Sequence, residues 1–273
     1  MPKISILMGV YNTPRPEVLQ AAMQSVYAQS CRDFEFIICD DGSTDHTSEL
    51  LRAYSKGEEA RTILLPSQGN HGLAAALNRC LDAASGEYIA RMDADDVSYP
   101  ERLARQAAFL DSHPQFALVG CQADLFDDGG VWGERRPKEY PEKRDFLFGS
   151  QFMHPTILMR RQVLCGLGGY RADAITRLAE DYDLFMRLYA AGWRGCNLPE
   201  KLYAYRADPA ALRRRTWRRR WEEAQVRWRG FGELGLMPLG ALYAAKPLLV
   251  GLIPQGLLRR LRGEKTRPGK PSL

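Results

Sequence analysis

The chain has 273 residues, which is enough for one sizeable α/β domain with an appendage. Its hydrophobic fraction of 45% and charged fraction of 26% are ordinary for a globular protein and exclude a disordered or fibrous chain. The net charge of +5 is unevenly placed, because basic residues gather at positions 213–220 and again at 259–270.

The six cysteines do not follow a metal-binding pattern. None of them pair as C-x-x-C, and no histidine spacing joins them into a zinc site. We therefore expect reduced, buried thiols in a cytoplasmic protein. The N-terminus agrees with this location, since it enters an apolar segment without a signal-peptide cleavage site. No run of about 18 uninterrupted apolar residues predicts a spanning helix.

Strands and helices are predicted to alternate through the first two thirds of the chain. Apolar, β-prone runs predict strands at residues 4–10, 34–39, 61–65, 88–92, 116–120, 157–159 and 202–205. Helical spacing predicts helices at residues 17–29, 47–54, 73–84, 100–112 and 178–191. Residues 127–143 indicate a loop or hairpin. This alternation is typical of a doubly wound α/β fold, with a mostly parallel sheet flanked by helices and ending near residue 210.

An acidic cluster follows the strand at residues 88–92, and ligands of such sheets bind at the carboxyl ends of strands. The carboxylates of Asp93-Ala94-Asp95 suit Mg²⁺ or Mn²⁺ held together with a substrate diphosphate. The alternative is a solvated acidic turn with a helix cap at Asp96 or Ser98. For an isolated D-x-D, that alternative is the more common meaning.

A second acidic cluster, Asp40-Asp41-Gly42-Ser43, ends another predicted strand. Asp41 can accept a hydrogen bond from a nucleobase, and the same residues can form an Asx turn into the next helix. The two interpretations are compatible. Neither a P-loop nor a G-x-G-x-x-G fingerprint occurs in the first half of the chain.

A third acidic pair, Glu180-Asp181, lies near the start of a predicted helix. The helix dipole stabilises a carboxylate there and keeps it ionised, as a general base should be. The alternative is a solvated first turn whose carboxylates pair with Arg177 or Arg187.

Six segments in the same order resemble the family 2 glycosyltransferases, which have a glycosyltransferase A-type fold with Rossmann-like nucleotide binding. They are residues 5–12, 34–45, 70–78, 86–96, 154–156 and 180–184. The resemblance covers about residues 3–206. Beyond Arg206 the composition shifts to arginine and tryptophan, then to leucine, glycine and proline, so we place a boundary near residue 210. Residues 1–210 would be the catalytic domain, and residues 211–273 a helical, Arg-rich and apolar extension.

The resemblance also implies roles for individual residues. It makes Asp181 the catalytic base, Glu180 and His154 acceptor-side residues, and Asp95 the ligand of Mn²⁺ or Mg²⁺. Within the donor site, Asp41 would read the base and Asp93 would lie near the ribose. The donor-binding residues implied are Val10, Asn12, Asp41, Ser43, Asn78, Arg91, Asp93 and Ala94.

One departure from the family pattern occurs late in the chain. The family often has a histidine after a Tyr-Arg pair, whereas Tyr205-Arg206 is followed here by Ala207-Asp208. The diphosphate contact expected from that histidine would pass to Arg206 or Arg213.

The implied reaction is a single, inverting displacement. Asp181 would deprotonate an acceptor hydroxyl, which attacks the anomeric carbon of a nucleotide-sugar, with UDP-sugars favoured. The acceptor would be a glycan or a lipid-linked glycan in polysaccharide biosynthesis. A sugar-phosphate nucleotidyltransferase would want a Gly-rich, basic loop near the first strand, and residues 9–12 do not supply one. A non-catalytic scaffold is disfavoured by the intact Asp93, Asp95 and Asp181.

The extension has its own signature. Pro238, Pro247, Pro254 and Lys246 argue against a straight spanning helix over residues 234–261. Short apolar helices flanked by arginines would instead suit peripheral contact with the inner face of the plasma membrane. Trp217, Trp221 and Trp228 would suit the interface between the lipid headgroups and the acyl chains of such a membrane. The alternatives are packing on the catalytic domain or a dimer contact, whereas no motif indicates nucleic-acid binding.

Overall fold

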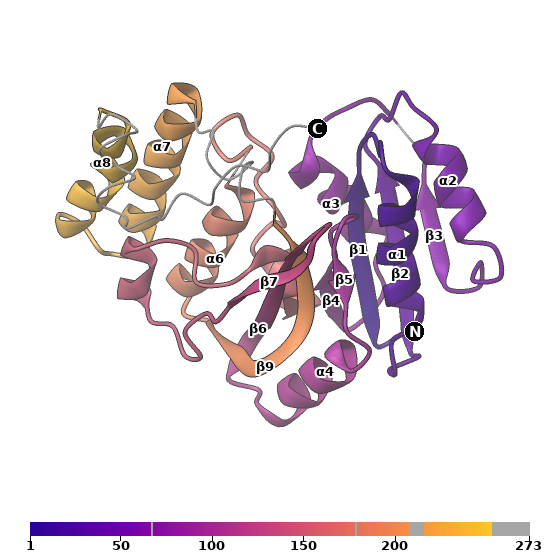
Figure 1. The fold of residues 1–273 in the computed structure, drawn as a ribbon. Coiled ribbons are helices and arrows are strands. Elements are labelled where there is room, and N and C mark those ends of the chain that lie inside the picture. The colour runs from indigo at the N-terminus through magenta and orange to yellow at the C-terminus, as the bar shows by residue number, and fades with distance from the viewer. Residues whose placement is uncertain (67, 178, 208–215, 253–273) are drawn as a thin grey trace.

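The computed structural model describes residues 1–66, 68–177, 179–207 and 216–252. These residues form a nine-stranded mixed sheet in the order β3-β2-β1-β4-β8-β6-β9-β5, with β7 paired to β6 (Figure 1). The strands are β1 (Ile4–Val10), β2 (Phe34–Asp40), β3 (Thr62–Leu65), β4 (Tyr88–Arg91), β5 (Val97–Ser98), β6 (Phe116–Asp127), β7 (Gly130–Arg135), β8 (Leu158–Arg160) and β9 (Arg194–Arg206). The helices are α1 (Pro16–Tyr27), α2 (Thr47–Tyr54), α3 (Leu73–Ala83), α4 (Arg102–Ser112), α5 (Arg161–Gly166), α6 (Glu180–Ala190), α7 (Trp217–Glu233) and α8 (Leu239–Leu252), with 3₁₀ turns η1 (Lys143–Leu147) and η2 (His154–Thr156).

The first half of the sheet confirms the predicted parallel arrangement. Strands β3, β2, β1 and β4 are all parallel, and Val10 lies in register with Asp40. Each is joined to the next by a crossover helix, as parallel strands require. The second half departs from a uniformly parallel sheet, because β8 is antiparallel to both β4 and β6. No long crossover helix separates β6 from β8, so the chain returns in the opposite direction through β7, η1 and η2.

Several boundaries differ from the predictions. Strand β6 continues to Asp127, and the turn at residues 127–130 makes the predicted hairpin with β7. Strand β9 begins at Arg194, well before the predicted start at 202, and pairs in parallel with β6. Pro199 and the polar residues around it hid this strand, and the pairing shifts register there. Position 178, the predicted start of a helix, lies outside the described residues, and α6 begins at Glu180.

Helices cover both faces of the sheet. Residues from α1, α2 and α4 share a hydrophobic cluster with Ile4, Ile6 and Met8 of β1 on one face. Helices α3, α5 and α6 share the other cluster with Leu7 and Ile37. The central strands β1 and β2 are therefore buried on both sides, which explains their almost unbroken apolar sequences.

The extension packs on the catalytic part through α7, which lies against α6 (Figure 1). Val226, Phe231 and Leu234 are buried in the same cluster as α6. The predicted alternative in which the extension packs on the catalytic domain thus holds for this face of α7. The proposed boundary near residue 210 falls outside the described residues. Among the helices that the structure describes, none is long and apolar enough to cross a membrane.

All six cysteines are free thiols. Cys39, Cys80, Cys121 and Cys196 are buried as predicted. Cys31 is only half-buried, and the expectation is wrong for Cys165, which is exposed near the end of the short helix α5.

Candidate active site

The carboxyl ends of β1 and β2 and the loops that follow them hold four of the predicted donor-binding residues, Val10, Asn12, Asp41 and Ser43, and we call this group the donor ledge. Asn12 adopts a positive φ of 43°, and its backbone N–H donates to the Ser43 hydroxyl at 2.9 Å. The Asn12 side-chain oxygen accepts from the Thr44 N–H at 2.9 Å. The Asp41 N–H donates to the Val10 carbonyl at 2.8 Å. Val10, Asn12, Asp41 and Ser43 are therefore held as one unit.

The carboxylate of Asp41 also fixes a second loop to this ledge. Its two oxygens accept from the backbone N–H groups of His71 at 3.0 Å and Gly72 at 2.8 Å. Gly42, with φ of 85°, allows the close approach, since a Cβ there would lie 2.5 Å from the Asn70 nitrogen. A pocket of about 330 Å³ lies beside the joined loops, lined by residues 70–74, 172–174 and 177. Asp41 thus holds the two loops together, and each of its carboxylate oxygens keeps a lone pair that could accept a hydrogen bond from a nucleobase.

Asp93, Asp95 and Asp96 form a carboxylate cluster after β4, with ligand atoms within 4.8 Å of one another. Partial desolvation and the charge of Asp93 raise the pKa of Asp95, whose outer side is exposed. Burial and the charges of Asp93 and Asp95 raise the pKa of Asp96 well above its usual range. Such repulsion between hard oxygen ligands is relieved by a divalent cation, so the residues fit Mn²⁺ or Mg²⁺.

Asp96 is the member of this cluster that sequence reasoning misplaced. It does not cap a helix, because α4 begins at Arg102 with Glu101 as its N-cap. One carboxylate oxygen of Asp96 instead accepts from the Arg206 N–H at 2.7 Å, and the other has no hydrogen-bond partner among the residues that the structure describes. Ser98 is no cap either, since its hydroxyl accepts from Gln29 at 3.0 Å. The run D-x-D-D contained the signal for a third carboxylate.

Arg206 lies at this cluster, as the departure from the family pattern suggested. Its side chain donates to the Asp95 carbonyl at 3.2 Å and stacks over Phe126 at 4.6 Å. Its guanidinium also pairs with Asp128 at 2.8 Å. Arg213, the other candidate, lies outside the described residues.

Arg91 acts both on this cluster and on the predicted acceptor-side residue His154. It is buried at the end of β4 and forms an ion pair with Asp93. Burial opposes its charge, yet Asp93 raises the pKa of Arg91. Burial and the charge of Arg91 hold the pKa of His154 well below its usual range, so the imidazole is neutral.

Glu180 and Asp181 form the first turn of α6. Burial and the charge of Asp181 raise the pKa of Glu180 to about 7, and one of its carboxylate oxygens has no hydrogen-bond partner within the described part of the chain. Burial also raises the pKa of half-buried Asp181, while Arg91 opposes the shift in both residues. Desolvation thus outweighs the helix dipole. The predicted alternative pairing with Arg187 does not form, because Arg187 pairs with Asp183 at 2.7 Å.

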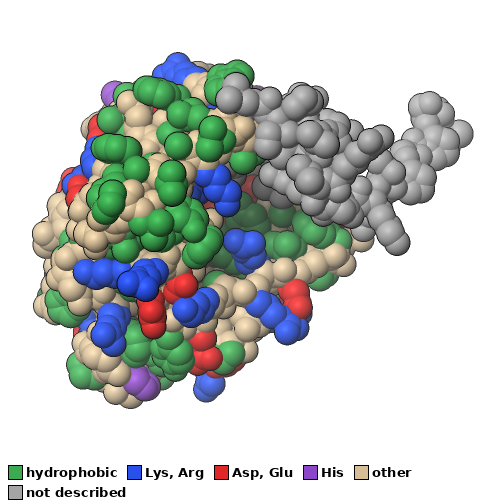
Figure 2. Space-filling model, turned by 90° about the vertical axis from the view of Figure 1, so that its left-hand side faces the viewer, with side chains coloured by type: hydrophobic (Ala, Val, Ile, Leu, Met, Phe, Trp, Pro, Cys, Tyr) green, Lys and Arg blue, Asp and Glu red, His purple; other side chains and the backbone are tan. Residues whose placement is uncertain are grey.

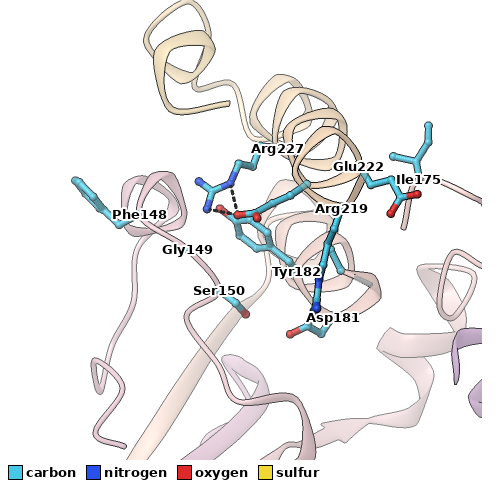
Figure 3. A pocket seen from close by; sticks show the side chains of 11 residues that line it. Phe148, Gly149, Ser150, Ile175, Asp181, Tyr182, Arg219, Glu222 and Arg227 are labelled. Carbon is cyan, nitrogen blue, oxygen red and sulfur yellow. Dashed lines mark hydrogen bonds and ion pairs between the residues drawn. The ribbon is translucent and has the colours of Figure 1, made fainter. Parts of the chain in front are cut away.

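A pocket of about 340 Å³ opens at Asp181, between α6 and α7 (Figure 3). Arg219 projects from α7 into this pocket. Further along α7, the Arg227 guanidinium lies over the Tyr182 ring, 5.4 Å from its centroid, and pairs with Glu223 at 3.0 Å. The contribution of α7 to this pocket was not predicted, because nothing in the local sequence of the extension indicates that it packs beside Asp181.

Two predicted site residues have structural partners of their own. The Asn78 amide pairs with the backbone of Tyr170, at 2.8 Å and 2.9 Å, and ties α3 to the segment before α6. His154 is buried, and its Nε2 lies 3.0 Å from the Tyr170 hydroxyl. Tyr170 therefore links both residues and is a site component that sequence reasoning missed. Ala94 lies half-buried between the carboxylates of Asp93 and Asp95.

Comparison of the chain with known proteins identifies its family. Residues 5–166 match the family model described as glycosyl transferase family 2. The chain is 38% identical over 272 residues to the putative glycosyltransferase EpsE of Bacillus subtilis (strain 168). The alignment covers 100% of this chain and 97% of EpsE.

Solved structures share the fold. TarS of S. aureus, residues 1–349 in complex with UDP-GlcNAc, superposes with a TM-score of 0.69 at 20% identity, covering 90% of this chain and 70% of TarS. The mannosyltransferase PcManGT of Pyrobaculum calidifontis, in complex with GDP-Man and Mn²⁺, gives 0.62 at 21% identity, covering 96% and 79%. Since the family model spans more than half of the chain and EpsE matches nearly all of it, the chain belongs to glycosyltransferase family 2.

Proposed function

We propose that this glycosyltransferase moves a sugar from a nucleotide-diphosphate donor to a hydroxyl of a glycan or lipid-linked acceptor in polysaccharide biosynthesis. The observation that carries the proposal is the position of buried Arg91. Its charge acts on Asp93 of the carboxylate cluster and on both Glu180 and Asp181 of the base turn. Arg91, which pairs with Asp93, is thus a cation shared by the carboxylates that we assign to the donor side and to the acceptor side, and this supports a transfer reaction.

On the donor side, Asp95 is the proposed metal ligand, with Asp93 and Asp96 close enough to share the ion. Mn²⁺ or Mg²⁺ would neutralise charge on the departing diphosphate. Arg206 adds a fixed cation beside Asp95. The ledge at Asp41 would hold the nucleoside, with Val10, Asn12 and Ser43 shaping it. A UDP-sugar is the favoured donor, and the TarS complex with UDP-GlcNAc supports that choice.

On the acceptor side, Asp181 lines the pocket between α6 and α7 and is the proposed base. It takes the proton of the acceptor hydroxyl, whose oxygen forms a bond to the anomeric carbon as the bond to the diphosphate oxygen breaks. Attack from the face opposite the diphosphate inverts the anomeric configuration. Glu180 and neutral His154 would form the acceptor wall. A lipid-linked acceptor would bring the protein to the cytoplasmic face of a membrane.

The test combines donor binding with product analysis. We expect a panel of UDP- and GDP-sugars with Mn²⁺ to identify one donor that raises the melting temperature, and chelation to abolish that rise. Asp181→Asn should retain donor binding and lose transfer, whereas Asp95→Asn should weaken metal-dependent donor binding. Near wild-type transfer by Asp181→Asn would refute the base assignment. Retention of the donor's anomeric configuration, measured by NMR of the product, would refute the single displacement.

A second assay, with a sugar 1-phosphate and a nucleoside triphosphate as substrates, separates the nucleotidyltransferase alternative. That reaction would form a nucleotide-sugar from a sugar 1-phosphate and a nucleoside triphosphate and release pyrophosphate. Family membership disfavours it, and so does the loop after β1, where Tyr11 and Asn12 stand in place of a Gly-rich basic segment. Pyrophosphate release without glycoside formation would establish it.

A further inference from the structure

The two helices of the extension expose an unusual amount of apolar surface. On α7, Trp217, Trp221 and Trp228 are 55%, 57% and 60% exposed. On α8, Leu239, Leu242 and Leu249 are 55%, 71% and 59% exposed. The leucines recur at helical spacing, so they form one stripe along α8. Contiguous exposed apolar surface of this kind marks an interaction site in a protein that is otherwise well packed.

A groove between the two helices completes this surface. It has a volume of about 500 Å³ and is lined by Trp217, Arg218, Trp221, Leu248 and Leu249. Its walls are therefore indole rings and leucine side chains, with one guanidinium at the rim. Tryptophan beside arginine is the combination that favours the boundary between lipid headgroups and acyl chains.

The charge of the chain is divided in a way that favours an anionic partner. Residues 211–273 hold 15 of the 38 Lys and Arg but 4 of the 33 Asp and Glu, a formal charge of +11 against −6 for residues 1–210. Three successive arginines, Arg218, Arg219 and Arg220, lie in the first turn of α7 beside the groove. Figure 2 shows this side of the molecule, where hydrophobic side chains gather and Lys and Arg border them.

The apolar surface is next to the proposed acceptor pocket. Arg219 and Glu222 line the pocket of Asp181, while Trp217, Arg218 and Trp221 line the groove, so one or two turns of α7 serve both. Among the described residues, no ion pair engages the Arg219 guanidinium. An anionic group near the pocket therefore finds a cation, and an attached hydrocarbon chain finds the apolar surface alongside.

We infer that the outer face of α7 and α8, which we call the α7–α8 face, docks on an anionic lipid bilayer and so presents a lipid-linked acceptor to Asp181. This inference rests on the proposed function for the acceptor, but the docking itself is independent of catalysis. Apolar insertion and arginine attraction together give the two signals that stable peripheral binding needs. Other occupants of the face, a second copy of the chain or its own residues 253–273, predict different results below.

The experiment uses the full chain and vesicles of phosphatidylcholine with or without phosphatidylglycerol. We expect cosedimentation with the anionic vesicles, little with neutral ones, and release as salt is raised, because each arginine near an anionic surface contributes about fivefold in affinity. The double variant Trp217→Ala/Trp221→Ala should lose on the order of tenfold or more in partitioning. Its melting temperature and donor binding should stay as in the wild type.

The matched control is Trp193→Ala, which removes a tryptophan that is 37% exposed outside the extension and should not change partitioning. Equal binding to neutral and anionic vesicles, or equal loss in both tryptophan variants, would overturn the inference. A wild-type dimer that the double variant makes monomeric, without vesicle binding, would assign the face to a second copy. Absence of vesicle binding in a monomer would also overturn it, as residues 253–273 would then be the simplest cover.

The outcomes separate docking from catalysis. If Asp181-dependent transfer is found but vesicle binding is not, the docking inference fails and the proposed function stands. If vesicle binding is found but no transfer to any acceptor occurs, the proposed function fails and the docking surface stands.

Discussion

The ion pairs of Asp183 should determine whether the first turn of α6, which holds the proposed base Asp181, keeps its position. Asp183 is 1% exposed and lies two residues after Asp181. Its carboxylate pairs with Arg187 at 2.7 Å and with Arg171 and Arg229 at 3.0 Å each. These arginines come from α6, from the segment before α6 and from α7. One buried carboxylate therefore ties three parts of the acceptor side together.

We predict that Asp183→Asn destabilises the protein by about 3–5 kcal/mol, because it leaves Arg187 as a buried, unpaired cation. The side chain of Arg187 is 6% exposed, so it cannot regain hydration. Its remaining donors reach the carbonyls of Leu167 at 2.7 Å and Gly169 at 2.9 Å, which do not neutralise it. Arg171 and Arg229 are 35% and 28% exposed and add little, at most about 1 kcal/mol each.

Urea unfolding followed by circular dichroism measures this change, which corresponds to a melting temperature lower by about 10 °C. The matched control is Glu49→Gln, which breaks an exposed pair with His46 and should stay within about 0.5 kcal/mol of the wild type. An Asp183→Asn variant within 1 kcal/mol of the wild type would refute the view that these ion pairs hold the turn.

Two further predictions concern the base turn and the donor ledge. Glu180 has a folded pKa of about 7, above its unfolded value near 4.5, so the folded state binds its proton more tightly and loses stability as pH rises between those values. Glu180 should contribute about 3 kcal/mol to this loss, so the loss between pH 4.5 and pH 7.5 should be smaller by that amount in Glu180→Gln, as unfolding at the two pH values measures; parallel pH profiles would contradict it. Gly42→Ala should lose donor affinity at least tenfold, since its Cβ would lie 2.5 Å from the Asn70 nitrogen. The control is Gly57→Ala, because Gly57 has the same φ of 85° but open space where the Cβ would lie. Its effect should be limited to about 1 kcal/mol of backbone strain without loss of donor affinity. Equal donor binding by both variants would contradict the steric argument.

The sequence by itself determined the parallel half of the sheet and the places where chemistry gathers. Apolar runs on both faces of β1 and β2 can be satisfied only by burial between two layers of helices, and this constraint is local. The positions of Asp41 and Asp95 after strands followed from the same alternation. The turn that follows Asp40-Asp41-Gly42 and leads into α2 was also readable, since the Thr47 N–H donates to Asp45, two residues before it, as an Asx turn requires.

Only the tertiary structure decided which of these residues lie together and which of them instead form structural hydrogen bonds. The pairing of β9 with β6 joins segments about 80 residues apart and is interrupted near Pro199, so no local period marks it. Asn78 and His154 both depend on Tyr170, which lies far from Asn78 in the chain. The placement of α7 beside Asp181 depends on Val226 and Phe231 finding the core of α6. Local sequence encodes periodicity and turns, whereas contacts between distant segments depend on how complete surfaces pack, and that packing is what joins the donor ledge, the base and the α7–α8 face.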